Sequence, residues 1–273
     1  MPPRDAALDT LEGPALIDFR HEHDISAFAR DRLRFPLEPA QQRLLQTTGP
    51  RVILNCSRQW GKSSMAAIVA LHRAYSREKA LILIFSPTQR QSSELIEKIR
   101  ELAIRLDIQQ RGDGVNSDSL RLPNRSRIVA LPGIERNIRG FSSASLILID
   151  EAARVDDALY RAVRPILANL RGDLWLMSTP NGKRGFFFHA WSASGQDSPK
   201  GWTRAKGWTR VSVAATDCPR FTPEFLEEER EVQGDAWFRQ EYMCEFLEGE
   251  AGVFTYEEIV SALADKGILW KIS

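Results

Sequence analysis

The sequence has no apolar run close to the roughly 20 residues that a membrane-spanning helix needs. Its three cysteines, Cys56, Cys218 and Cys244, are too few and too scattered for a disulfide framework or a zinc site. They indicate a reduced compartment. Residues 1–5 also lack the basic-then-apolar pattern of a secretion signal. We therefore expect a cytosolic protein.

An excess of one charge is also missing, since 37 basic residues face 36 acidic ones. Without an overall basic field, any surface for nucleic acid must be a local patch. Histidine is scarce, and His21, His23, His72 and His189 show no ligand spacing with cysteines or carboxylates. We assign none of them a role. At 273 residues the chain can form one large domain or two small ones.

The chain does contain a phosphate-binding pattern, at residues 51–63. An apolar strand leads into a polar loop, and Gly61-Lys62-Ser63 then opens a helix. Glycine lets the backbone approach a phosphate, and the N–H groups that begin a helix favour an anion. Lys62 can reach the β- and γ-phosphates of a nucleotide, and Ser63 can ligate Mg²⁺. The usual pattern starts with glycine, whereas Cys56 holds that place here.

A second motif supports the first, because residues 146–149 are all apolar and Asp150 and Glu151 follow them. Such a run is typical of a strand buried in a parallel sheet, and ligands bind at the carboxyl ends of those strands. We expect Asp150 to hold Mg²⁺ and Glu151 to polarise the water that attacks the γ-phosphate. The alternative is a core strand that ends in two solvated carboxylates. Because both motifs occur in the right order, we favour an NTPase.

Further residues are candidates for the nucleotide site. Arg58, inside the loop, can stabilise transition-state charge, or it can pair with a nearby carboxylate. Gln41 has an amide that can bond adenine, beside Phe35 and Pro39 as an apolar wall. The predicted nucleotide-binding residues are Gln41, Ser57, Arg58, Gln59, Trp60, Gly61, Lys62, Ser63 and Ser64.

Three other segments can take part. Arg139 can be a finger that reaches a neighbouring subunit's nucleotide, a DNA contact or a solvated residue. Ser178 and Thr179 end a strand expected beside the Asp-Glu strand, where their hydroxyls can sense the γ-phosphate. Residues 89–91 can contact DNA phosphates or cap a helix. The aromatics of residues 186–191 are better explained as core than as a stacking platform.

Strands and helices alternate from residue 52 to residue 192, which predicts an α/β fold with a mostly parallel sheet flanked by helices. The predicted strands are 52–55, 81–86, 127–131, 146–149 and 174–178, with a hairpin over 119–131. The predicted helices include 25–33, 63–76, 92–106, 185–192, 222–233 and 236–247. Gly-Trp-Thr-Arg occurs at 201–204 and again at 207–210, which we interpret as a local duplication in a loop or hairpin, since it is too short for a repeat architecture.

Together these motifs resemble the ATPase domain of phage terminase large subunits. The resemblance covers about residues 35–250 and includes residues 57–63, 138–141, 148–153, 178–182 and 238–246. It implies a P-loop NTPase of the additional-strand, conserved-glutamate type with a small lid subdomain. The implied division is an N-terminal arm and helix at 1–34, the ATPase core at 35–199, the lid at 200–250 and a linker at 251–273.

The resemblance also implies a function, namely hydrolysis of ATP with Mg²⁺ to translocate double-stranded DNA into a capsid in the host cytoplasm. Glu151 matches the catalytic base, Arg58 the P-loop arginine and Arg139 a proposed trans finger. The implied partners are a portal protein, a small terminase subunit and further copies in a ring, the isolated chain being a monomer. Family members add a nuclease domain, and we expect no nuclease activity from these residues.

Two other classes of protein share parts of this pattern. A superfamily-2 helicase has the P-loop, the Asp-Glu pair and an upstream glutamine, but it needs a second RecA-like domain, for which residues 195–273 are too short. A non-catalytic prophage remnant can bind DNA or partners without hydrolysis. Retention of Lys62, Ser63, Asp150 and Glu151 argues against decay.

Overall fold

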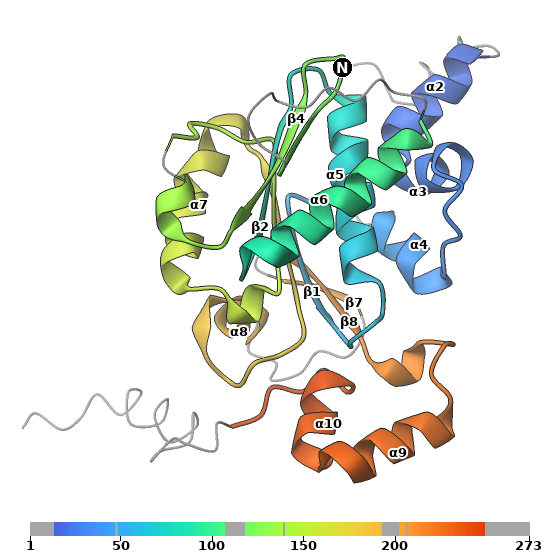
Figure 1. Ribbon diagram of the computed structural model, residues 1–273, viewed down its shortest axis with the longest axis vertical. Coiled ribbons are helices and arrows are strands. Elements are labelled where there is room, and N and C mark those ends of the chain that lie inside the picture. The colour runs from blue at the N-terminus through green and yellow to red at the C-terminus, as the bar shows by residue number, and fades with distance from the viewer. Residues whose placement is uncertain are drawn as a thin grey trace, which may run out of the picture.

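A single mixed β-sheet organises the chain in the computed structural model, which describes residues 14–46, 49–106, 118–138, 140–192, 202–205 and 207–248. Its eight strands follow the order β3-β4-β2-β5-β6-β1-β8-β7 (Figure 1). The strands are β1 Arg51–Cys56, β2 Leu81–Ser86, β3 Ser119–Arg121, β4 Arg127–Pro132, β5 Leu146–Asp150, β6 Asp173–Ser178, β7 Trp202–Ala205 and β8 Trp208–Val213. No helix in the described ranges is long and apolar enough to cross a membrane.

The inner strands from β4 to β8 pair in parallel, and only the edge strands β3 and β7 are antiparallel. Parallel neighbours need crossover connections, which here place helices on both faces of the sheet. Both faces are therefore buried, which explains the continuous apolar runs at residues 81–85 and 146–149.

Two helical layers cover the sheet (Figure 1). One core cluster joins the sheet to α5 Lys62–Ser76, α6 Gln89–Ile104 and the N-terminal helices; the other joins it to α7 Asp157–Leu170 and α8 Gly185–Ser192. The N-terminal helices are α2 Pro14–His23, α3 Ile25–Ala27, the π-helix η1 Phe28–Arg32 and α4 Pro39–Leu45. Short 3₁₀ turns form η2 Glu135–Ile138, η3 Ala152–Arg154 and η4 Ala215–Asp217.

Strand β6 lies between β1, which leads into the P-loop, and β5, which ends in Asp150. This inserted strand is the additional strand of the predicted fold type. Ser178 is the last residue of β6, and Thr179 follows it. Both therefore lie between the P-loop and the Asp-Glu pair. The predicted α/β fold, with a mostly parallel sheet flanked by helices, is confirmed.

Beyond residue 199 the structure differs in detail from what the pattern predicts. The duplicated stretch forms the hairpin β7–β8, and β8 pairs in parallel with β1. The sheet thus continues into the range expected for the lid. Helices α9 Pro223–Gln233 and α10 Asp235–Glu241 lie below the sheet in Figure 1, around a small core that contains Leu226 and Phe238.

Some local predictions need correction. The helix predicted over 236–247 ends at Glu241, and the chain then returns toward α8, where Phe246 packs against the rings of Phe187 and Phe188. His21, within the N-terminal arm and helix expected at 1–34, is only 4% exposed, and its carbonyl contacts the ring of His72. The aromatics of α8 are core residues, as predicted.

Candidate nucleotide site

Cys56 is the last residue of β1 and pairs with Val213 of β8. Its backbone is therefore extended, and its side chain is fully buried. An extended position needs no glycine, so the departure from the usual loop pattern causes no strain. Burial raises the pKa of the Cys56 thiol to about 12, which keeps it protonated.

The loop turns through two residues with left-handed backbone, Gln59 at φ 56° and Gly61 at φ 102°. The φ of Gly61 favours glycine, and a Cβ atom there would also press on Nε2 of Gln41 at 3.0 Å. That Nε2 donates to the Trp60 carbonyl at 3.1 Å, and Oε1 of Gln41 accepts from the Glu38 N–H at 3.1 Å. Gln41 thus supports the loop directly, and its adenine contact stays a prediction.

Lys62 begins α5 and is buried. Its Nζ donates to the carbonyls of Cys56 at 3.3 Å and Ser57 at 3.2 Å, and it lies 3.8 Å from Oε1 of Glu151. Burial lowers the pKa of Lys62, but the acidic groups around it, Cys56, Glu151 and Asp150, outweigh this and raise that pKa overall. A buried cation therefore faces the hollow in which a phosphate would lie.

Arg58 pairs with a carboxylate, the alternative that the sequence left open. Its Nε donates to Oε2 of Glu241 at 2.8 Å, and its guanidinium lies 5.4 Å from the ring centroid of Trp237. Its backbone N–H also donates to the Glu241 carbonyl at 3.1 Å. The hydrogen bond with Glu241 raises the pKa of Arg58. Helix α10 thus holds the P-loop by both side chain and backbone.

Asp150 and Glu151 lie at the carboxyl end of β5, as predicted. Burial raises the pKa of Asp150 to about 6, and one of its oxygens accepts from the Glu151 N–H at 3.1 Å. Glu151 has left-handed backbone, with φ 47°. Its carboxylate accepts from Arg154 at 3.0 Å and from the Ser178 hydroxyl at 3.3 Å. Ser178 is therefore in direct contact with the proposed base.

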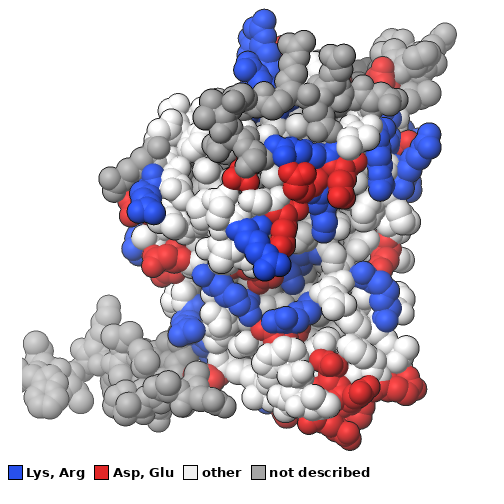
Figure 2. Space-filling model, in the orientation of Figure 1, with Lys and Arg blue, Asp and Glu red and all other residues white. Residues whose placement is uncertain are grey.

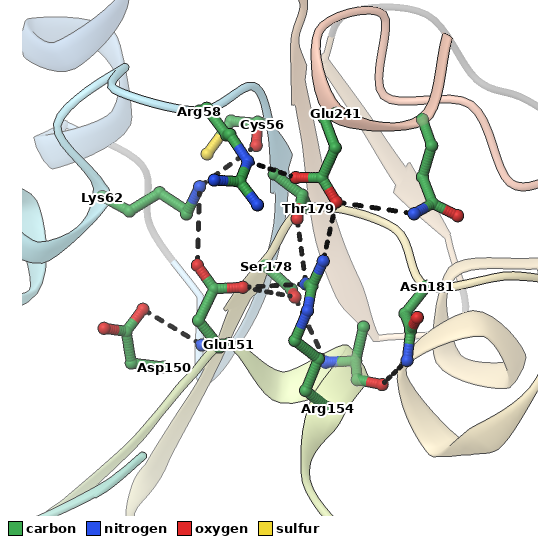
Figure 3. A network of polar contacts seen from close by, with 12 residues as sticks. Cys56, Arg58, Lys62, Asp150, Glu151, Arg154, Ser178, Thr179, Asn181 and Glu241 are labelled. Atoms are coloured by element: carbon green, nitrogen blue, oxygen red, sulfur yellow. Dashed lines mark hydrogen bonds and ion pairs between the residues drawn. The ribbon is translucent and has the colours of Figure 1, made fainter. Parts of the chain in front are cut away.

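Arg154 and Glu241 were not predicted, yet they connect the site (Figure 3). Nη1 of Arg154 donates to Glu151 and, at 3.0 Å, to Oγ1 of Thr179, while Nη2 donates to Oε1 of Glu241 at 2.7 Å. Glu241, only 2% exposed, also accepts from Arg58. Its charge has two cationic partners, which is what a buried carboxylate requires. The signal in the sequence was weak, because these residues are 87 positions apart.

The hollow around these groups has a volume of about 530 Å³. Residues from five separate segments line it: Arg58, Gln59, Gly61, Lys62, Ser63, Gln91, Lys98, Glu151, Arg154, Thr179 and Glu241. Lys98 of α6 adds a cation that the sequence did not indicate. Ser57, Trp60, Asp150 and Ser178 are buried beside the hollow, while Arg139 lies outside the described residues.

A divalent cation fits this site only together with a phosphate ligand. No group of three or more His, Cys, Asp or Glu side chains is placed to hold a metal in the part of the chain that the structure describes. The available donors are the Ser63 hydroxyl and the Asp150 carboxylate, both hard oxygen ligands suited to Mg²⁺. Mg²⁺ commonly keeps waters and phosphate oxygens as its other ligands, and the open hollow has room for these.

The P-loop on β1, the inserted strand β6 and the acidic pair after β5 define a P-loop NTPase. The comparison with known families is consistent with this class. Residues 53–261 match the family model "Terminase large subunit, T4likevirus-type, N-terminal", so the chain belongs to this family.

Similar proteins agree with this assignment. The terminase large subunit of Thermus virus P23-45 is 26% identical over 243 residues, which cover 77% of this chain and 48% of that protein. The chain thus spans about half the length of this curated relative. The large terminase ATPase domain of Thermus phage P74-26 matches with TM-score 0.66 and 21% identity, covering 80% of this chain and 97% of that one. The large terminase of the bacteriophage HK97 matches with TM-score 0.66 and 14% identity, covering 82% of this chain and 55% of that one.

Asp150→Asn is expected to stabilise the protein against unfolding, but only near and above neutral pH. The folded-state pKa of about 6 exceeds the ordinary 3.8, so the ionised carboxylate destabilises the fold. This loss of folding free energy is absent at low pH. It grows as pH rises from the ordinary pKa to the folded-state pKa and reaches roughly 2–3 kcal/mol. The free energy of unfolding, measured in denaturant at pH 4 and pH 8, tests this expectation. Asp18→Asn, at an exposed position, is the control. An equal effect at both pH values would contradict the burial argument.

Glu241→Gln is expected to lower the free energy of unfolding by about 1–3 kcal/mol, because two arginines lose a charged acceptor. The arginine contacts hold the pKa of Glu241 below its ordinary value although burial opposes them. The stabilisation is therefore present above the ordinary glutamate pKa and is lost as pH falls through the lowered pKa. Glu245→Gln, at an exposed pair with Arg239, is the control and should cost less than about 1 kcal/mol. If both variants lose the same free energy of unfolding, the buried contacts of Glu241 stabilise the fold no more than an exposed ion pair does.

Proposed function

We propose that this chain is the ATPase of a viral DNA-packaging motor, which hydrolyses ATP with Mg²⁺ to translocate double-stranded DNA into a capsid. The observation that carries the proposal is the convergence of Lys62 and Glu151 at one hollow, with Asp150 buried next to Glu151 at the end of β5. A cation for phosphate, a carboxylate for metal and a carboxylate for water are the groups that this hydrolysis needs. Family membership supports the same activity.

The P-loop residues 57–64 bind the triphosphate in this proposal. Lys62, now bonded to two loop carbonyls, turns its ammonium toward the β- and γ-phosphates, which are stronger acceptors. Ser63 and Asp150 would hold Mg²⁺, which would supply positive charge to the phosphate oxygens. Gln41 keeps the loop in shape through the Trp60 carbonyl, and its contact with the base is part of the proposal.

Glu151 orients and polarises the attacking water, which requires its carboxylate to stay fixed. Arg154 and Ser178 supply that restraint through their bonds to the same oxygen. Arg58, once released from Glu241, stabilises charge that develops on the γ-phosphate. Because Arg154 contacts Glu151, Thr179 and Glu241, loss of the γ-phosphate can be relayed through Ser178 and Thr179 to α10.

The wider assembly follows from the family and belongs to the same proposal. Double-stranded DNA is the translocated substrate, and a portal protein and a small terminase subunit are partners. Several copies form a ring in the host cytoplasm, whereas the isolated chain at low concentration is a monomer. Arg139 supplies a finger to a neighbouring subunit's nucleotide. We propose no nuclease activity for the described residues.

Glu151→Ala is expected to lower the rate of ATP hydrolysis by about 10²–10⁴-fold, because the water loses its base. Binding of a non-hydrolysable ATP analogue should persist in this variant and be lost in Lys62→Ala. Steady-state phosphate release and equilibrium binding measure the two effects. Glu101→Ala, at an exposed position of α6, is the control and should keep wild-type turnover. Undiminished hydrolysis by Glu151→Ala would refute the assigned base.

Mixing Arg139→Ala with Glu151→Ala is expected to restore part of the turnover that each variant lacks alone. In a mixed assembly, a subunit with intact Glu151 can receive Arg139 from its neighbour. Turnover measured against mixing ratio, at high protein concentration, tests this exchange. An inactive mixture would place Arg139 in its own subunit's site. Wild-type turnover by Arg139→Ala alone would remove it from the reaction.

A further inference from the structure

Four arginines gather at the edge of the sheet opposite to the nucleotide site. Arg161, Arg164 and Arg171 belong to α7 and its C-cap, and Arg51 is the first residue of β1. All four are exposed, and together they line a hollow of about 620 Å³. A second hollow of about 420 Å³ shares Arg51, Arg161 and Arg164 and extends toward α8. We call this continuous surface the arginine trough.

The positive charge of the trough is not balanced by the carboxylates that the structure describes. Among the described residues, no carboxylate forms an ion pair with any of the four arginines. Arg164 instead lies 5.9 Å from the ring centroid of Tyr160, which stacks on Phe186. Asp157, which also lines the second hollow, accepts from the Phe186 N–H at 2.8 Å. The trough therefore offers unpaired guanidinium groups to an acidic partner.

The floor of the trough is apolar, which limits the kind of partner that fits. Pro50, Pro165, Leu167 and Leu174 line it, and Leu170 at the end of α7 is 58% exposed. Surfaces that bind nucleic acid are more polar than this, since they mainly contact phosphate and sugar. An acidic helix with apolar residues among its carboxylates matches both the four arginines of the trough and its apolar floor.

Helix α9 has this composition. Residues 222–248 contain nine acidic and two basic residues, and the exposed carboxylates of α9 include Glu224, Glu227, Glu228 and Glu231. Figure 2 shows these acidic side chains gathered over α9 at the lower right. Two apolar residues lie among them, Phe225 at 38% exposed and Val232 at 71% exposed.

The row of carboxylates is short enough to fit along the row of arginines. Arg161 and Arg171 are ten positions apart, about 15 Å along α7 and its C-cap, and Glu224 to Glu231 span about 10 Å. Within one chain the surfaces cannot meet, because α7 and α9 lie on opposite sides of the molecule (Figure 1). A second copy of the chain carries the complementary surface in the same geometry.

We propose that α9 of one copy docks into the arginine trough of the next copy. Such a contact joins two different surfaces of the same chain, so it is heterologous and propagates from subunit to subunit, closing into a ring where the rotation permits. The inference deepens the subunit assembly in the proposed function and does not depend on ATP hydrolysis.

Sedimentation of the full chain at low salt, over a range of concentrations, tests the contact. Wild type should self-associate, and 0.5 M salt should weaken this by screening. The trough variant Arg161→Glu/Arg164→Glu and the α9 variant Glu227→Arg/Glu231→Arg should each raise the dissociation constant at least about tenfold. Arg30→Glu/Arg125→Glu, which makes the same charge change at exposed positions elsewhere, should behave as wild type.

A mixture of the two variants gives the sharpest result. Each variant keeps one intact surface and carries one reversed surface, and both kinds are complementary across the two variants. The mixture should therefore recover the association that neither variant shows alone, with the two variants alternating. Combining all four substitutions in one chain should restore self-association. No association of wild type, or equal association of the trough variant, would overturn the proposal. Binding of duplex DNA that the trough variant loses, without self-association of wild type, would overturn it in favour of a nucleic-acid surface.

Discussion

The carboxylate of Glu241 is the interaction on which the site depends. It is buried between Arg58 of the P-loop and Arg154, which follows β5, so it joins α10 to the phosphate-binding loop and to the proposed base. A buried charge of this kind is tolerated only while its partners stay in place. Any movement of Arg58 toward a phosphate must therefore change how α10 is held.

The order of the strands explains why these groups meet at all. In a parallel sheet the carboxyl ends of the strands share one edge, and β6 is inserted between β1 and β5. The carboxyl end of β6 thereby brings Ser178 into contact with Glu151 and Thr179 into contact with Arg154. The proposed hydrolysis and its relay to α10 use this single edge, whereas the arginine trough occupies the opposite one.

Local patterns predicted the strands β1, β2, β4, β5 and β6 and the helices α5, α6, α8 and α9, but not the helix α7. Apolar runs such as residues 81–86 mark strands buried on both faces, and the spacing in α6 marks a helix with one apolar side. The position of the hairpin β7–β8 was harder to predict, because its place beside β1 depends on pairing across about 150 residues. The end of α10 at Glu241 was missed because the tail leaves the helix to pack Phe246 on α8.

The sequence was sufficient to identify Lys62, Ser63, Asp150 and Glu151 as a nucleotide site, because the chemistry of phosphate and metal restricts which residues can stand at those spacings. It was also sufficient for the α/β class. Only the folded chain shows that Arg58 pairs with Glu241 and that Arg154 bridges three segments. Ion pairs between distant segments leave no periodic trace, since they arise from the packing of elements and not from local backbone preference.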